Sequence, residues 1–175
     1  MPSRRDLVLT GLGIMGGAAV PFVLANASHA SETEEAKRPT MTLYPIGIVK
    51  KSKEETRLNI YPDFQEALLG LEGFSHAWVF YWFDKNDNEK KRSVRCVHPH
   101  GKKENPLTGV FACRSPARPN LIAMTLCQVQ SVDKGVVRIG KIDAFDSTPI
   151  LDIKPYIPGI DSPRQEIQTP DWLGS

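Results

Sequence analysis

Residues 77–83 read Ala77-Trp78-Val79-Phe80-Tyr81-Trp82-Phe83, the most apolar run of the chain beyond its first 30 residues. Aromatic and β-branched side chains favour a β-strand over a helix. Because every position is apolar, the run predicts a strand that is buried on both faces or lies at an interface. It therefore indicates a β-rich fold.

Further short elements are predicted on both sides of this strand. The segment that begins at Pro62 has apolar side chains at helical spacing and reaches Gly70 and Gly73, which predicts one short helix. Short strands separated by turn residues are typical of a small barrel or sandwich. We expect a mostly β, small single-domain β-barrel with one or two short helices, and further strands within residues 42–50, 57–61, 92–97, 109–113, 121–130, 136–142 and 149–153.

Composition narrows the class of protein. The chain has 175 residues, enough for one compact domain, and its 41% hydrophobic and 24% charged residues are typical of a globular protein. Lys and Arg number 22 against 20 Asp and Glu, so the overall charge gives no argument for a nucleic-acid partner. The three cysteines form no C-x-x-C pair and His98-Pro99-His100 lacks a third ligand at a useful spacing, so no metal site is predicted.

Residues 1–30 have the pattern of a secretory leader. Arg4-Arg5 precede a glycine-rich apolar stretch that ends in small residues up to Ala30, which resembles a twin-arginine signal peptide. We therefore expect a periplasmic or extracytoplasmic protein with no stable membrane span after cleavage. The alternatives are an uncleaved anchor, and a cytoplasmic protein if translation starts at Met41. Residues 31–40 then form a linker, 41–160 the domain and 161–175 a C-terminal tail.

The densest polar cluster is residues 111–120, Phe-Ala-Cys-Arg-Ser-Pro-Ala-Arg-Pro-Asn. Prolines at positions 116 and 119 restrict the backbone, so the loop can present Arg114 and Arg118 in fixed positions. Two guanidinium groups suit a carboxylate or a phosphate. A proline-stiffened surface loop with two solvated arginines explains the same pattern.

Two later clusters carry carboxylates. In the segment from Asp143 to Pro149, the side chains of Asp143 and Asp146 could accept hydrogen bonds from ribose hydroxyls, or Asp146 could simply form an Asx-turn. In residues 151–158, alternation places Asp152, Lys154 and Tyr156 on one face of an extended segment. These three side chains could assist proton removal, or form a salt bridge beside a packed tyrosine.

Three stretches in the same order resemble one known family. Residues 109–120 resemble the GVFATRSPxRPNPIG signature of the TsaA/TrmO-like proteins, and residues 143–158 (DAFDSTPILDIKPYIP) resemble DxxDGTPxLDIKPYxP. Residues 71–78 (LEGFSHAW) resemble the LEGFSHLW motif. The chain is on this basis identified as a member of that family, as a short variant with a leader.

The resemblance implies a β-barrel methyltransferase that uses S-adenosyl-L-methionine to methylate threonylcarbamoyladenosine in tRNA, and that acts as a homodimer. Carried over by position, it implies a catalytic role near the methyl group for Asp152, Lys154 and Tyr156. It implies cofactor binding by Arg114, Ser115, Arg118, Asn120, Met124, Asp143, Ala144, Phe145 and Asp146.

The chain also departs from the family pattern. The family's G-x-P-x-Q-P-like loop is replaced by residues 51–56 (KSKEET), and its Phe-His pair by Phe83-Asp84. A leader also conflicts with a tRNA substrate, which is cytoplasmic. The alternatives are therefore an exported relative that methylates a small molecule, and a non-catalytic binding domain on the same barrel.

Overall fold

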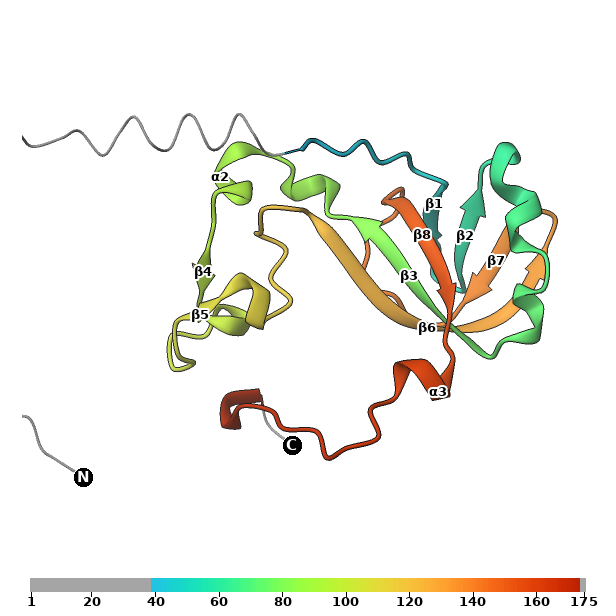
Figure 1. Ribbon diagram of the computed structural model, residues 1–175. Helices are drawn as coiled ribbons and strands as arrows, with labels where there is room; N and C mark the ends of the chain where they lie inside the picture. Colours follow the sequence, from blue (N-terminus) through green and yellow to red (C-terminus); the bar gives the residue numbers. More distant parts are fainter. Residues whose placement is uncertain (1–38, 174–175) are drawn as a thin grey trace, which may run out of the picture. The chain divides into compact units, whose positions relative to one another are not determined.

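The computed structural model describes residues 39–173, and residues Thr42–Ser175 form one compact unit. Six antiparallel strands close into a barrel in the order β1-β2-β7-β6-β3-β8 (Figure 1). This closure confirms the predicted mostly β barrel. The barrel strands are β1 (Gly47–Lys51), β2 (Thr56–Ile60), β3 (His76–Trp82), β6 (Ile122–Asp133), β7 (Val136–Ile139) and β8 (Pro149–Pro155).

The barrel interior holds one apolar core. Inward-facing residues alternate with outward-facing ones along the strands, as the two-residue period of a strand requires. Ala77, Val79 and Tyr81 of β3 are buried, whereas Trp78 and Phe80 between them are only partly buried. The apolar run at 77–83 is therefore not buried on both faces, and its outer face remains available to other molecules.

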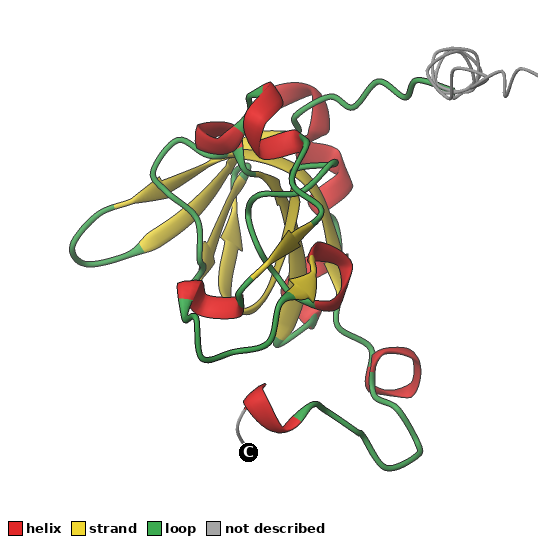
Figure 2. Ribbon diagram, turned by 90° about the vertical axis from the view of Figure 1, so that its left-hand side faces the viewer, coloured by secondary structure: helices red, strands yellow, loops and turns green. Residues whose placement is uncertain are grey.

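Short helical turns surround the strands (Figure 2). The predicted helix after Pro62 is a 3-10 helix, η1 (Pro62–Leu68), followed by η2 (Leu71–Gly73). Gly70 between them has a φ of 88°, a left-handed conformation that suits glycine. The others are η3 (Asp84–Asn86), α2 (Glu89–Arg92), η4 (Pro99–Gly101), η5 (Val110–Ala112), α3 (Pro158–Asp161) and η6 (Asp171–Leu173).

Two of the predicted strands are wrong in extent. Where residues 92–97 were expected as one strand, α2 ends at Arg92 and only β4 (Cys96–Val97) is extended. The side chain of Asn88 accepts a hydrogen bond from the Lys91 amide, and this N-cap starts α2, whose last residue is the first residue of the expected strand. Residues 109–113 likewise give β5 (Thr108–Gly109) followed by η5, and β4 and β5 form a separate two-stranded sheet.

The β6–β7 connection is tighter than the sequence indicates. β6 continues to Asp133, and Lys134 and Gly135 turn the chain with φ values of 44° and 78°. Two consecutive positive φ values are the signature of a type I′ hairpin turn. None of the helices within residues 39–173 is long and apolar enough to cross a membrane.

Candidate functional site

A groove of about 680 Å³ lies over the outer face of β3 and β6. Trp78 lies opposite Leu126 and Phe80 lies opposite Met124 in the antiparallel register. These side chains form an apolar floor because the residues between them point into the barrel core. Polar groups stand around this floor, namely Arg114, Arg118, Asn120, Thr125 and Asp143.

The proline-rich loop forms one wall of the groove. The Ala117 amide donates a hydrogen bond to Ser115 Oγ at 3.2 Å, and Arg118 Nη2 donates to the carbonyl of Val110 at 3.0 Å. Of the two predicted guanidinium groups, Arg118 therefore braces the loop. Arg114 is exposed, and within residues 39–173 its side chain makes no hydrogen bond or ion pair. It is the guanidinium that is available to an anionic ligand.

A second brace joins this loop to β3. The indole Nε1 of Trp82 donates to Asp87 Oδ2 at 3.0 Å, and Arg92 Nε donates to Asp87 Oδ1 at 2.7 Å. The guanidinium carbon of Arg92 lies 5.2 Å from the centre of the Trp82 ring, and Arg92 Nη1 donates to the carbonyl of Pro119 at 3.1 Å. The hydrogen bonds from Arg92, and then from Trp82, hold the pKa of Asp87 below its ordinary value.

This brace predicts a pH dependence that NMR can measure. The pKa of Asp87 is lowered in the folded chain, so the interaction is complete above the ordinary value of 3.8 and is lost as the pH falls through the lower, folded value. The indole N–H resonance of Trp82 should therefore keep its position down to pH 3.8 and shift only below it. The indole resonance of Trp78 serves as an internal control, and an Asp87→Asn variant should remove the transition. A Trp82 midpoint at or above 3.8 would contradict the proposed brace.

The two carboxylates of residues 143–149 lie in different places, Asp143 at the groove and Asp146 near β1. The Tyr81 hydroxyl donates to the carbonyl of Asp143, and the side chain of Asp143 lines the groove. Ala144 packs against the barrel core, and Phe145 is exposed. Burial, the largest cause, raises the pKa of Tyr81, so its phenol stays protonated and keeps this hydrogen bond.

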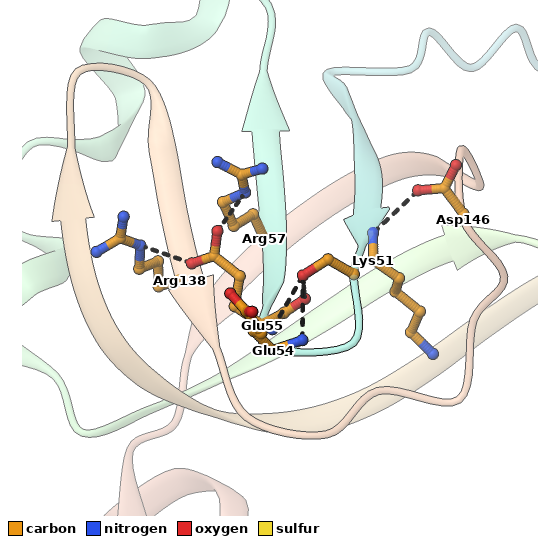
Figure 3. Close-up of polar contacts among 7 residues, drawn as sticks. Lys51, Glu54, Glu55, Arg57, Arg138 and Asp146 are labelled. Carbon is orange, nitrogen blue, oxygen red and sulfur yellow. Dashed lines mark hydrogen bonds and ion pairs between the residues drawn. The ribbon is translucent and has the colours of Figure 1, made fainter.

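Asp146 turns away from the groove toward β1. Its Oδ1 accepts a hydrogen bond from the Lys51 amide at 2.9 Å (Figure 3). Its Oδ2 accepts one from Ser147 Oγ at 2.9 Å, and Lys50 Nζ lies 3.7 Å from Oδ2. The amide of Lys51, then the hydroxyl of Ser147, lower the pKa of Asp146. The structure therefore does not bring Asp146 together with Asp143, and the carboxylate holds the 146–148 turn to the barrel instead of forming an Asx-turn.

The third predicted cluster lies beside a second hollow of about 510 Å³, which shares Trp78, Phe80 and Met124 with the groove. Lys154 lines this hollow, and its Nζ lies 2.9 Å from Asp152 Oδ2. The hydrogen bond that Lys154 donates to Asp152 raises the pKa of Lys154, so the amine stays charged at neutral pH.

Tyr156 follows the end of β8, and its role is partly structural. Its hydroxyl lies 2.6 Å from Ser162 Oγ, and its ring centre lies 6.2 Å from that of Trp78. Neither Tyr156 nor Asp152 lines either hollow. Of the three residues predicted to be catalytic, only Lys154 therefore reaches the surface over β3 and β6.

The two departures from the family motifs have structural consequences. Residues 51–56 form a tight β1–β2 hairpin, in which Ser52 Oγ accepts hydrogen bonds from the amides of Glu54 and Glu55 (Figure 3). Asp84 accepts a hydrogen bond from Thr148 Oγ1 at 3.4 Å and pairs with Lys85 at 3.1 Å. Asp84 therefore fastens the turn after Asp146 and does not line the groove.

Sequence reasoning missed the aromatic side chains of the groove. The apolar run predicts a strand buried on both faces or at an interface for Trp78 and Phe80, and Phe111 is expected at the start of a strand, yet Phe111 is 82% exposed and all three line the groove. Their signal was the apolar run itself, which did not say which face was free. Within residues 39–173 no cluster of three metal-ligating side chains occurs.

The site combines one unpaired guanidinium, one carboxylate and aromatic walls. Its volume lies within the roughly 300–1,000 Å³ of small-molecule sites. Arg114 can hold a carboxylate, Asp143 can accept hydrogen bonds from hydroxyl or amino groups, and Trp78, Phe80 and Phe111 can contact a flat ring or a cationic centre. The arrangement suits an amphipathic ligand that carries both an anion and an aromatic ring.

The chain is similar to several known proteins. The family model of the tRNA-methyltransferase O N-terminal domain matches residues 36–162. The chain is 44% identical over 122 residues to a probable S-adenosyl-L-methionine-binding protein of Methanocaldococcus jannaschii, which covers 70% of this chain and 97% of that protein. It is also 44% identical over 109 residues to a tRNA (adenine(37)-N6)-methyltransferase of Mus musculus, across 62% of this chain and 24% of the mouse enzyme.

Solved structures share the barrel. A crystal structure of TrmO matches with a TM-score of 0.59 and 28% identity over 74% of this chain and 64% of that one. TrmO from Pseudomonas aeruginosa matches with a TM-score of 0.58 and 27% identity over 76% and 62% of the two chains. The chain thus spans nearly the whole length of the Methanocaldococcus jannaschii relative and under two thirds of each of these two solved chains. On the sequence motifs, the barrel and these matches together, the chain belongs to the TrmO family, through its N-terminal domain.

Proposed function

We propose that this chain binds S-adenosyl-L-methionine in the groove over β3 and β6 and transfers its methyl group to an adenine amine in tRNA. The single observation that carries the proposal is the exposed guanidinium of Arg114, which has no partner among residues 39–173 and lines an aromatic groove of sufficient size. Two relatives that match 70% and 76% of this chain are probable S-adenosyl-L-methionine-binding proteins. As a member of the TrmO family, the chain is an S-adenosyl-L-methionine-dependent methyltransferase.

The residues of the groove fit the chemical groups of the cofactor. Arg114 would hold the methionine carboxylate, and Asp143 would accept hydrogen bonds from the ribose hydroxyls. Phe111 and Phe80 would contact the adenine ring, and Met124 would lie beneath it. When bound, the cofactor supplies a methyl group on a positively charged sulfur, ready for attack by a nucleophile.

The chain's own residues would position the acceptor and handle its proton. Methyl transfer to an amine releases one proton, which must reach a base or water. Lys154 stays charged beside Asp152 and cannot accept that proton. Asp152 lines neither hollow, so the proton would pass to water at the groove mouth, and Lys154, held by Asp152, would orient the acceptor. Trp78 and Phe80 exclude water from the floor of the site.

A homodimer would cover the apolar outer face of the barrel. Ile122, Met124 and Leu126 of β6 point away from the core and are each more than a third exposed. Together with Trp78 and Phe80 they line the groove, and a second copy could bury the part of this apolar surface that the cofactor leaves uncovered. Sedimentation at micromolar concentration should give a dimer, and a Leu126→Lys variant should be a monomer. A monomeric parent chain would contradict this part of the proposal.

Mass spectrometry of tRNA nucleosides tests the proposed activity. Full-length chain is incubated with S-adenosyl-L-methionine and tRNA from cells that lack the endogenous methyltransferase. The expected result is a gain of one methyl group on the modified adenosine next to the anticodon. Cofactor binding without any methylated nucleoside would instead favour a small-molecule acceptor or a non-catalytic binding domain.

The cellular location decides whether tRNA is within reach. The predicted leader, residues 1–30, lies outside the described residues, and export remains our proposal. A fusion of residues 1–35 to a reporter that folds before transport should be exported, and Arg4→Lys with Arg5→Lys should block the export. Retention of the unmutated fusion in the cytoplasm would reject the leader and leave the tRNA substrate accessible.

A further inference from the structure

The charge of the described chain is unevenly distributed. Residues 84–120, which we call the basic arm, contain nine Lys and Arg against four Asp and Glu. Residues 39–83 and 121–173 together contain nine Lys and Arg against twelve Asp and Glu. The near-neutral total therefore hides a positive arm on a negative barrel. Such an asymmetry favours a negatively charged partner on one side of the protein.

The basic arm is a distinct part of the structure. It leaves the barrel after β3, carries α2 and the two-stranded β4–β5 sheet, and returns at β6 (Figure 1). Its buried apolar residues Val110 and Ala117 lie outside the core cluster of the barrel, as does the adjoining Leu121. The brace of Trp82, Asp87 and Arg92 holds it to β3. The arm thus presents its charges from an ordered surface.

The cations of the arm divide into two groups. Four of them already have partners. Lys85 forms an ion pair with Asp84, and Arg92 forms one with Asp87. Arg118 donates a hydrogen bond to the Val110 carbonyl, and Arg95 donates one to the Arg92 carbonyl. Within the described part of the chain, the other side chains make no hydrogen bond or ion pair, and all are exposed: Lys90, Lys91, Lys102, Lys103 and Arg114. The four lysines can each meet a phosphate without first breaking a contact within the described residues, whereas Arg114 faces the groove.

The arm also reaches the groove and carries an aromatic side chain. Phe111 and Arg114 belong to the arm and line the groove, and Phe111 is 82% exposed. An exposed ring next to free cations is the combination by which proteins hold single-stranded nucleic acid, through base stacking and phosphate contacts. An RNA loop whose backbone lies along the arm would place its bases at the groove entrance.

We infer that the basic arm, residues 84–120, is the RNA-docking surface of this protein and binds the phosphate backbone next to the methylated base. The inference rests on the proposed tRNA substrate and specifies where that substrate lies. It separates cofactor binding from RNA binding, because the lysines of α2 and of the β4–β5 turn do not line the groove.

Salt-dependent binding of a tRNA transcript to the full-length chain tests this inference. The arm variant carries Lys90→Gln, Lys102→Gln and Lys103→Gln. The matched control carries Lys53→Gln, Lys134→Gln and Arg164→Gln, which removes the same charge from exposed residues outside the arm. Fluorescence anisotropy between 50 and 200 mM salt gives the affinity and its salt slope, and calorimetry gives the affinity for S-adenosyl-L-methionine.

We expect the arm variant to lose roughly 10- to 100-fold in tRNA affinity at 100 mM salt and about two units of salt slope, since each phosphate contact contributes about 0.7–0.9. The control variant should keep most of the parent's tRNA affinity and salt slope. The two variants should each keep the parent's affinity for S-adenosyl-L-methionine.

Equal losses of tRNA affinity in the two variants, or an unchanged salt slope in the arm variant, would overturn the inference but leave the proposal of a tRNA substrate intact. If the parent chain binds no tRNA, the substrate proposal itself fails. If it instead binds anionic lipid vesicles through the same lysines, the arm is a membrane contact and the inference is wrong.

Discussion

Replacement of Arg114 by alanine is expected to weaken binding of S-adenosyl-L-methionine by about 10- to 100-fold, because a hydrogen bond to a charged group contributes roughly 1.5–3 kcal/mol. Arg114 is the one groove guanidinium that makes no hydrogen bond or ion pair within residues 39–173. Its loss therefore removes the partner of the cofactor carboxylate without disturbing the loop. Isothermal titration calorimetry on the full-length chain measures the change.

The matched control for this variant is Arg138→Ala. Arg138 is an exposed arginine of β7 that pairs with Glu55 across the barrel surface, at 3.0 Å (Figure 3). It does not line the groove, so its removal should leave cofactor affinity within twofold of the parent. An Arg114→Ala chain that binds as tightly as the Arg138→Ala chain would show that the carboxylate lies elsewhere.

The largest loss of stability is expected from Gly47→Ala. A Cβ at position 47 would lie 2.3 Å from the carbonyl oxygen of Asn59 on the neighbouring strand. Gly47 pairs with both Ile60 and Ile150, so it stands where β1 meets β2 and β8 and neither backbone can move away freely. We expect the free energy of unfolding to fall by about 3 kcal/mol, at the upper end of the effects of overpacking. Thermal denaturation should show a fall in Tm of roughly 10 °C.

Gly73→Ala provides the comparison. A Cβ at position 73, in the short helix η2, meets no heavy atom within 4 Å. The Tm of this variant should stay within about 2 °C of the parent, as for most surface substitutions. If Gly47→Ala and Gly73→Ala denature at the same temperature, the barrel is not closed through a tight β1–β2 contact.

The local pattern of the sequence predicted the β-rich fold, and the motifs predicted the barrel and the family. Alternation and turn residues located most strands within a few positions, because strand period and turn chemistry are local properties. Closure of the barrel through Gly47 and Ile150 joins residues about a hundred positions apart, and no local pattern encodes such a pairing. The sequence also did not predict that the outer face of β3 is exposed, since an all-apolar run does not reveal which side of a strand is covered.

The candidate site was only partly predictable for a similar reason. Arg114 and Asp143 were expected together, and the structure places both around one groove. Asp146 was grouped with Asp143 because it is three residues away, yet a turn at Ser147, with a φ of 65°, directs its carboxylate to the Lys51 amide. The net charge of the whole chain does not reveal the basic arm, because the negative charge of the barrel offsets the positive charge of the arm.

The most direct test of the central claim uses the methyl group of Met124. The chain contains four methionines, and Met124 lies on the floor of the groove. Full-length protein with isotope-labelled methionine methyl groups is titrated with S-adenosylhomocysteine and followed by NMR. The account predicts that the Met124 signal shifts in proportion to ligand bound, that Met41 does not respond, and that Arg114→Ala moves the titration to higher ligand concentration. Binding detected by calorimetry without any shift of the Met124 signal would contradict the assignment of this groove to the cofactor.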